Sequence, residues 1–340
     1  GPLVEREALH TRLDDGLEHR VTLLSAPAGS GKTTLVRSWM AARPDLPPVA
    51  WVSLDAGDND PVRFWRYVLT ACASIQSALG QEALAILNRA QQPVFESALT
   101  LFINELTQLE CQALLVLEDY HTINEPRVHE TLAFLLDYLP ESLRVILITR
   151  GEPPLPLARW RAHGDLGELR AVDLRFSTQE THRFLQQAIP FALTPEILAH
   201  LAERTEGWVA GLRLLALAAQ GRQEPQEIEH TLANFTGSHQ HILRYLVADV
   251  LSTQPGDLQI FLLQTSLLNR LNASLCTAVT ERADSARLLA RLDQADLFLY
   301  PLDGAGQWYR YHALFAEAMQ HEAHQRFSME TLHTLYDRAS

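Results

Sequence analysis

One segment of the sequence has the residue types and spacing of a phosphate-binding loop. It reads Val21-Thr-Leu-Leu-Ser-Ala-Pro-Ala-Gly-Ser-Gly-Lys-Thr-Thr34, an apolar run, then small residues, then a helical pattern. Gly29 and Gly31 allow backbone N–H groups to surround an anion, and a helix that begins near Lys32 adds the positive end of its dipole. Lys32 is the only lysine among 28 lysines and arginines. A site between phosphates requires such a compact ammonium, so we predict that the segment anchors ATP or ADP.

The phosphate-loop motif assigns separate roles to its polar residues. Lys32 would reach the β and γ phosphates, Thr33 would bind Mg²⁺, and Thr34 could reach the α phosphate. The loop residues that would supply backbone contacts are Ala28, Gly29, Ser30 and Gly31. Ala26 replaces the usual first glycine of the motif, which is a small change. A flexible Gly-Ser turn is the alternative interpretation of the segment.

A second motif, Leu114-Leu-Val-Leu-Glu-Asp119, is an apolar run that ends in two acids. Because carboxylates are not buried without partners, Glu118 and Asp119 should project from the carboxyl end of a strand, where a cation would neutralise them. By position, Glu118 would hold Mg²⁺, usually through water, and Asp119 would orient or deprotonate an attacking water. A solvated pair of acids that caps the strand is the alternative.

Arg150 is the third candidate catalytic residue. It follows the apolar run Val145-Ile-Leu-Ile-Thr149, so it would approach the same sheet edge as the acids and could contact the γ phosphate. The alternative is a solvated surface arginine.

The first half of the chain alternates short apolar runs with helical patterns, which is typical of parallel βαβ units. The pattern predicts a doubly wound, mainly parallel α/β sheet of the P-loop NTPase type that ends near residue 175. A helix should begin at Asp60-Pro61, an N-cap followed by proline. The strands are expected near Val21–Ser25, Val49–Leu54, Ala113–Leu117, Arg144–Ile148 and Leu169–Leu174.

From Ser177 the pattern changes to helices, and Ser177-Thr-Gln-Glu180 resembles a capping box. Further along, two short strand candidates, Leu297–Leu302 and Trp308–Tyr311, flank a Gly-containing turn. Helices with a small hairpin suggest a winged helix. The expected domains are a nucleotide-binding domain at 3–175, an α-helical domain at 176–237, a winged-helix domain at 238–328 and the start of a truncated helical sensor region at 329–340.

Composition and charge restrict the function further. A formal net charge of −13 disfavours direct binding to duplex DNA, which depends on clustered positive charge. No apolar run is long enough to cross a bilayer, so we expect no contact with a membrane. The three cysteines, Cys72, Cys111 and Cys276, are far apart in apolar stretches, so we expect buried thiols in a reducing cytoplasm.

These motifs together resemble the STAND class of signal-transduction ATPases, and specifically the MalT-like, large ATP-binding LuxR-type transcription regulators. The resemblance runs over essentially the whole chain. Besides the phosphate loop, it rests on Trp51-Val-Ser-Leu-Asp-Ala-Gly-Asp-Asn-Asp-Pro-Val-Arg-Phe-Trp65, Leu117-Glu-Asp-Tyr-His121, Thr205-Glu-Gly-Trp-Val-Ala-Gly-Leu-Arg-Leu214 and Trp308-Tyr-Arg-Tyr-His-Ala-Leu-Phe315.

The resemblance implies three domains folded over a buried ADP in a resting state. Val4 and Arg6 match the segment that contacts adenine in this class. Gly207 and Trp208 match a Gly-x-Pro segment that contacts adenine in related animal and plant proteins, without its proline. His312 matches a winged-helix histidine that contacts the β phosphate and locks the closed form. Glu118 stands where an aspartate is commoner, so hydrolysis could be altered.

The resemblance also implies a signalling switch with slow ATP hydrolysis. An unknown small-molecule or protein inducer would bind a missing C-terminal sensor, ATP would replace ADP, and the ATP-bound protein would self-associate. DNA would be bound only through a domain absent from this chain. Two alternatives remain: a STAND protein with a non-DNA effector domain, and a P-loop phosphotransfer enzyme, which would turn over rapidly at a free acceptor site.

Overall fold

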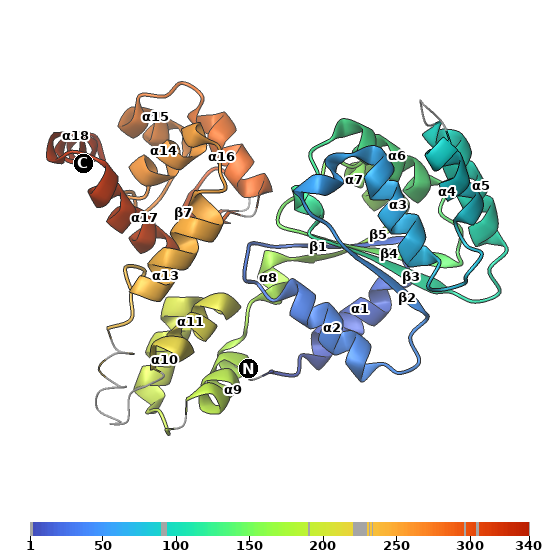
Figure 1. Ribbon diagram of the computed structural model, residues 1–340. Helices are drawn as coiled ribbons and strands as arrows, with labels where there is room; N and C mark the ends of the chain where they lie inside the picture. The colour runs from blue at the N-terminus through green and yellow to red at the C-terminus, as the bar shows by residue number, and fades with distance from the viewer. Residues whose placement is uncertain are drawn as a thin grey trace. The chain divides into compact units, whose positions relative to one another are not determined.

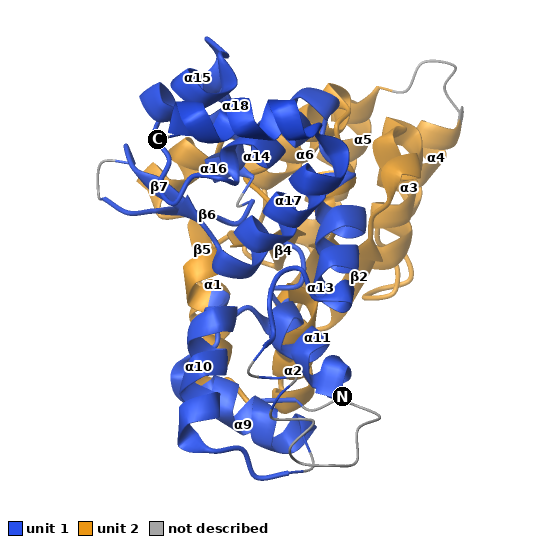
Figure 2. Ribbon diagram, turned by 90° about the vertical axis from the view of Figure 1, so that its left-hand side faces the viewer, with its two compact units in different colours: residues 1–4, 27–31, 174–340 blue, residues 5–26, 32–173 orange. Residues whose placement is uncertain are grey.

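The chain forms two compact units (Figure 2). In this computed structural model the described residues are 3–89, 94–189, 191–219, 230, 232, 234–295, 297–303 and 306–339. The sheet unit consists of Glu5–Ala26 and Lys32–Asp173. The helical unit consists of Gly1–Val4, Pro27–Gly31 and Leu174–Ser340. Each unit is described by itself.

The sheet unit contains five parallel strands in the order β2-β3-β4-β1-β5. The predicted parallel sheet is therefore confirmed. Strand β4 lies between the strand that precedes the phosphate loop and the strand that ends in the two acids, which determines what can meet at their carboxyl ends. The strands are β1 Val21–Ser25, β2 Val49–Ser53, β3 Ala113–Glu118, β4 Leu143–Thr149 and β5 Leu166–Arg170.

Helices cover both faces of this sheet (Figure 1). On one side lie α1 (Glu7–Gly16) and α2 (Lys32–Ala42), and on the other α3 (Pro61–Cys72), α6 (Pro126–Asp137) and α7 (Leu157–His163). Along β3, Leu115 and Leu117 join a core with Phe64 of α3 and Leu132 of α6. Leu114 is equally buried but points to the opposite face, because successive side chains of a strand alternate. The central strands are therefore apolar throughout.

The helices of the sheet unit begin and end where the sequence provides caps. Asp60 caps α3 by accepting a hydrogen bond from the N–H of Arg63, and Pro61 is its first residue, as predicted. The helices are α1 Glu7–Gly16, α2 Lys32–Ala42, η1 Ala56–Asn59, α3 Pro61–Cys72, α4 Gln81–Arg89, α5 Phe95–Thr107, η2 Tyr120–Thr122, α6 Pro126–Asp137, α7 Leu157–His163 and α8 Ala171–Leu174.

Two expectations about this unit were wrong. The fifth strand ends at Arg170, and residues 171–174, predicted as strand, form α8. The carboxylate of Asp173 accepts a hydrogen bond from the N–H of Arg170, which turns the chain at that point. Cys111 is exposed just before β3, whereas Cys72 and Cys276 are buried as expected.

The helical unit starts with the predicted capping box, in which Ser177 and Glu180 bond to each other's backbone N–H groups. The predicted hairpin is also present, as an antiparallel pair of short strands; residues 304 and 305 of its turn lie outside the described residues. The elements are α9 Thr178–Ala188, α10 Pro195–Thr205, α11 Val209–Ala219, α13 Gln240–Tyr245, the π-helix η3 Leu246–Leu251, α14 Gly256–Thr265, α15 Ala273–Thr280, α16 Ser285–Gln294, β6 Leu299–Pro301, β7 Tyr309–Tyr311, α17 Ala313–Arg326 and α18 Met329–Ala339.

One hydrophobic core runs through the helical unit. Leu212 of α11, Leu262 of α14 and Phe315 of α17 are fully buried in the same cluster. Trp208 also belongs to it and packs edge-on against the ring of Phe298. Throughout the described ranges, no helix combines the length and apolar character needed to cross a membrane.

Candidate functional site

The phosphate-loop segment has the backbone conformation that an anion site requires. β1 ends at Ser25 and α2 begins at Lys32. Gly29 and Gly31 have φ values of +73° and +83°, in the left-handed region that favours glycine. Their N–H groups donate to no acceptor within the described ranges. Alternation of left-handed and ordinary residues turns successive amides toward one side, as in an anion-binding nest.

Lys32 is buried, and its side chain extends back toward the start of the loop. Its ammonium Nζ donates a hydrogen bond to the carbonyl oxygen of Ala26 at 2.6 Å. This contact keeps the only ammonium side chain of the sequence beside the loop that it follows. Thr34, by contrast, is exposed on α2, so the structure leaves its predicted phosphate contact without further support.

Glu118 is held by three donors from two neighbouring elements. Its Oε1 accepts a hydrogen bond from Thr33 Oγ1 at 2.6 Å. Its Oε2 accepts one from Trp51 Nε1 at 2.9 Å and one from Ser53 Oγ at 2.7 Å. Ser53 is the residue that pairs with Glu118 in the parallel register of β2 and β3. Topology therefore brings together a residue at the start of α2 and a strand-end acid that are distant in sequence.

The environment keeps Glu118 ionised. Burial alone would raise its pKa, but the hydrogen bonds from Thr33, Ser53 and Trp51, together with the charge of Arg37, lower it. Arg37 lies one helical turn after Thr33, and its Nη2 is 3.8 Å from Glu118 Oε2. A carboxylate in this state can accept hydrogen bonds or bind a cation at neutral pH.

Asp119 and Arg150 meet at the same edge of the sheet. Asp119 has a left-handed backbone with φ of 59°. Burial and the negative charge of Glu118 raise the pKa of Asp119, against the positive charges of Arg150 and Lys32. A raised pKa makes this carboxylate a better proton acceptor than an ordinary aspartate. Burial, Arg150 and Lys32 also lower the pKa of His121 to about 4, so its ring is neutral near pH 7.

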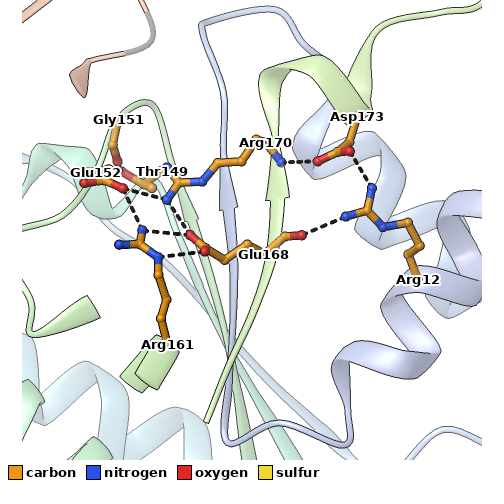
Figure 3. Close-up of polar contacts among 8 residues, drawn as sticks. All are labelled: Arg12, Thr149, Gly151, Glu152, Arg161, Glu168, Arg170 and Asp173. Carbon is orange, nitrogen blue, oxygen red and sulfur yellow. Dashed lines mark hydrogen bonds and ion pairs between the residues drawn. The ribbon is translucent and has the colours of Figure 1, made fainter. Parts of the chain in front are cut away.

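A polar network holds the segment that follows Arg150 (Figure 3). Glu152 accepts hydrogen bonds from Arg161 Nη2 at 2.7 Å and from Arg170 Nη2 at 2.6 Å. Both arginines also bond to Glu168 of β5. The loop after β4 is thus attached to α7 and β5 two residues beyond Arg150.

The same network continues to the end of the sheet unit. Arg12 of α1 donates to the carbonyl oxygen of Glu168 at 2.9 Å and forms an ion pair with Asp173 at 2.6 Å. Asp173 in turn holds the N–H of Arg170 (Figure 3). The charges alternate along the network, so each carboxylate lies beside an arginine.

In the helical unit, Trp208 contacts the phosphate loop directly. Its Nε1 donates to the carbonyl oxygen of Ala28 at 3.3 Å. Gly207 has φ of +73°, and a Cβ atom there would lie 2.3 Å from the carbonyl oxygen of Phe176. Gly207 is therefore required by the turn that presents Trp208. Val4 is buried in the same core as Ala28 and Trp208, whereas Arg6 is the N-cap residue of α1 in the sheet unit.

His312 is fully buried, and both of its ring nitrogens have protein partners. Nδ1 accepts the N–H of Leu314 at 3.2 Å, so Nε2 carries the proton that it donates to the carbonyl oxygen of Thr205 at 2.9 Å. Burial lowers the pKa of His312 despite the nearby carboxylate of Glu206, so the ring is neutral. Its contact with a β phosphate stays a prediction.

The oxygen donors at the sheet edge fit the predicted Mg²⁺. Thr33 Oγ1 and Glu118 Oε1 are hard oxygen ligands, which Mg²⁺ prefers, and they lie within hydrogen-bond distance of each other. Among the described residues, no group of three or more His, Cys, Asp and Glu side chains could form a metal cage. A hydroxyl and a carboxylate suit an ion that takes its other ligands from phosphates and water.

Sequence reasoning overlooked four side chains of this edge: Arg37, Trp51, Ser53 and His121. The positions of three of them offered a signal. Ser53 ends the strand next to β3, Trp51 lies two residues earlier on the same face, and Arg37 follows Thr33 by four residues in a helix. His121 Nδ1 lies 3.7 Å from Asp119 Oδ1, a proximity that only the turn after β3 creates.

The parallel sheet, its strand order and the strand–loop–helix segment at its edge define a P-loop ATPase fold, followed by a helical region. The comparisons with known proteins agree. The profile described as the MalT winged helix domain matches residues 247–331. The predicted winged helix is therefore confirmed.

Two curated relatives are regulators of the same kind. The HTH-type transcriptional regulator MalT of Vibrio campbellii is 33% identical over 306 residues, which are 89% of this chain and 33% of that protein. The same regulator of Klebsiella pneumoniae is 33% identical over 331 residues, which are 96% of this chain and 36% of that protein. The chain thus spans about a third of the length of these relatives, and the resemblance to the MalT-like regulators is confirmed.

Among solved structures, the chain is similar to a Signal Transduction ATPase with Numerous Domains (STAND) protein from Pyrococcus horikoshii. That protein has a tetratricopeptide repeat sensor, and the alignment covers 99% of this chain. The identity is 17%, the TM-score is 0.48, and the alignment covers 44% of that chain.

Proposed function

We propose that this chain is the ATP- and ADP-binding switch of a transcription regulator. The observation that carries the proposal is the phosphate-loop segment, with the buried Lys32 and two left-handed glycines whose N–H groups donate to no acceptor among the described residues. The similarity to the MalT regulators over most of the chain supports the regulatory role. Hydrolysis would be slow, as expected for a site that controls a conformational change rather than metabolic turnover.

Each site residue then has a role in binding or hydrolysis. The amides of Ala28–Gly31 and the Lys32 ammonium would hold the phosphates. Mg²⁺ bound by Thr33, and by Glu118 through water, would neutralise charge on the phosphate oxygens. Asp119, with its raised pKa, would accept a proton from the attacking water, and Arg150 would stabilise negative charge on the γ phosphate.

The regulatory partners belong to the same proposal. ADP would accompany the resting state, and an inducer acting through a region outside this chain would allow ATP to enter and the protein to self-associate. DNA would be contacted by a region outside this chain, in the cytoplasm. A switch from 1:99 to 99:1 needs about 5.5 kcal/mol of differential binding. One charged hydrogen bond contributes about 1.5–3 kcal/mol, so His312 alone could not lock the resting state.

Nucleotide binding is tested first on the purified protein. Denaturation followed by mass spectrometry should release ADP, and nucleotide-free protein should take up Mg-ADP and Mg-ATP in calorimetry. Lys32→Ala should weaken binding by about 10- to 100-fold, because a charged contact to phosphate is lost. The exposed Arg287 of α16 offers a matched control, because Arg287→Ala removes a positive charge elsewhere. Folded, nucleotide-free protein that takes up neither nucleotide would contradict the proposal.

The role of His312 is tested by exchange kinetics. His312→Ala should still bind ADP but release it faster, because the proposed lock on the resting state is removed. Exchange at the wild-type rate would exclude His312 from the mechanism. Rapid multiple turnover with a phosphate acceptor would instead indicate a phosphotransfer enzyme.

A further inference from the structure

Two consecutive peptide groups of the phosphate loop are held by one short segment of the helical unit. Trp208 Nε1 donates to the carbonyl oxygen of Ala28 at 3.3 Å, and the N–H of Ala210 donates to the carbonyl oxygen of Gly29 at 3.0 Å. A trans peptide places its N–H opposite its C=O. The two contacts therefore turn the N–H groups of Gly29 and Ser30 away from residues 208–210.

A third group completes the contact surface over Gly29. A Cβ atom built on Gly29 would lie 2.3 Å from Ala210 Cβ, 2.9 Å from the hydroxyl of Tyr245 and 3.3 Å from Trp208 Nε1. The Tyr245 hydroxyl therefore lies directly over the backbone of the loop, and the rings of Tyr245 and Trp208 are 5.8 Å apart. Any side chain at position 29 would collide with this surface.

Tyr245 lies immediately before an irregular helical segment. It is the last residue of α13, and the π-helix η3 follows at Leu246–Leu251. The N–H of Ser252 bonds to the carbonyl oxygen of Val247, five residues earlier, which is the π-helical pattern. Such segments are rare and occur frequently at functional sites.

We propose that Tyr245 is a positioning residue of the nucleotide site, acting with Trp208 on the peptide planes of Ala28–Ser30. The two side chains keep the Gly29 N–H turned toward the phosphates, while the Ser30 N–H donates to the carbonyl oxygen of Pro27 at 3.4 Å. Nucleotide release therefore depends on a helix that lies immediately before the matched winged-helix region. The inference rests on the proposed function, and it goes further by linking nucleotide binding at the loop to the position of α13.

The test compares release of a fluorescent ADP analogue by stopped flow. Tyr245→Phe removes only the hydroxyl that lies over the backbone of Gly29. It should speed release about fivefold, a change of about 1 kcal/mol, with an unchanged melting temperature. Trp208→Phe keeps a ring in the core but removes the N–H, and should act in the same direction. The control is Tyr336→Phe, a hydroxyl removal on an exposed side chain of α18, which should release at the wild-type rate.

The double variant separates a shared role from two independent ones. If both residues hold the same peptide planes, the effects of Tyr245→Phe and Trp208→Phe on the release rate should be less than multiplicative. Wild-type protein that binds the analogue, with Tyr245→Phe releasing at the same rate, would overturn this inference while leaving the proposed function intact. Wild-type protein that binds no analogue would overturn both. Faster release from Tyr336→Phe would also count against it.

Discussion

The carboxyl edge of the sheet and the turn at Thr205–Trp208 both surround a buried titratable side chain, but they are built from different contacts. At the edge, Glu118 is held by side chains from β2 and α2, and its pKa is lowered. At the turn, His312 is held by main-chain atoms, and burial lowers its pKa. Glu118 is therefore charged near neutral pH and His312 is uncharged.

The difference lies in how each region is specified. Parallel strands end at one edge, so a motif at one strand end predicts what it will meet there. No comparable sequence pattern predicts what the turn contacts. Its path depends on left-handed φ values at Glu206 and Gly207, 48° and 73°. Substitutions in the two regions should therefore have different consequences. They range from loss of local structure to a modest change in the free energy of unfolding.

The largest effect is expected at the turn, from Gly207→Ala. The new Cβ would lie 2.3 Å from the carbonyl oxygen of Phe176, and the backbone would keep a left-handed conformation. Strain and the loss of the Phe176–Gly207 hydrogen bond should destabilise α9–α11 by about 3 kcal/mol, measured by hydrogen exchange. The matched control is Gly256→Ala, where the Cβ meets nothing within 4 Å. Equal protection in the two variants would mean that the turn is not specified by its glycine.

A smaller effect is expected at the edge, from Glu118→Gln. The amide cannot accept the hydrogen bonds of Thr33, Ser53 and Trp51 equally well, so unfolding free energy at pH 7 should fall by about 2 kcal/mol. The folded pKa lies below the unfolded value of about 4.3, so this stabilisation is complete above that pH and is lost as pH falls through the folded pKa. Urea unfolding of both proteins at pH 7 and pH 3 measures it. A difference that persisted unchanged at pH 3 would contradict an ionised Glu118.

At the turn, the ion pair between Glu206 and Arg310 should contribute less to the free energy of unfolding than the contacts of Glu118. Arg310 donates to both carboxylate oxygens of Glu206 at 2.9 Å and 2.7 Å, and Glu206 also accepts the N–H of Ala313. Arg310→Ala should cost about 1–2 kcal/mol, because a largely buried carboxylate loses its cation. Arg310→Lys should restore part of the lost stability, since lysine keeps the charge but not the paired geometry. Urea unfolding of the three proteins measures these differences. Full recovery with lysine would show that only the charge of residue 310 matters.

The smallest effect is expected from the network after β4, through Glu152→Gln. The carboxylate is partly exposed and shares its two arginines with Glu168, so thermal unfolding should shift by less than about 1 kcal/mol and less still at high salt. Arg127→Ala, which removes an exposed pair with Glu130, is the control. A loss above about 3 kcal/mol would mean that the loop after Arg150 is a rigid part of the fold rather than a solvated network.

Much of the fold was predictable because it depends on local patterns. The apolar runs of β1–β4, the caps at Asp60 and Ser177 and the hairpin were all predicted close to their observed bounds. The failure at residues 171–174 has a specific cause: the edge strand β5 ends at Arg170, where the Asp173 carboxylate accepts a hydrogen bond from the Arg170 N–H. The periodicity of apolar residues does not predict that hydrogen bond.

The sequence by itself determined the residue types and short spacing from which the phosphate loop, the acid pair and Arg150 were predicted, because each prediction depends only on neighbouring residues. Tertiary structure alone decided that Trp51, Ser53 and Arg37 surround Glu118, that His312 bonds to main-chain atoms, and that Tyr245 lies over Gly29. Those contacts join residues distant in sequence through strand order, left-handed turns and packing on the core of the helical unit. They become specific only when the packed core has placed the backbone.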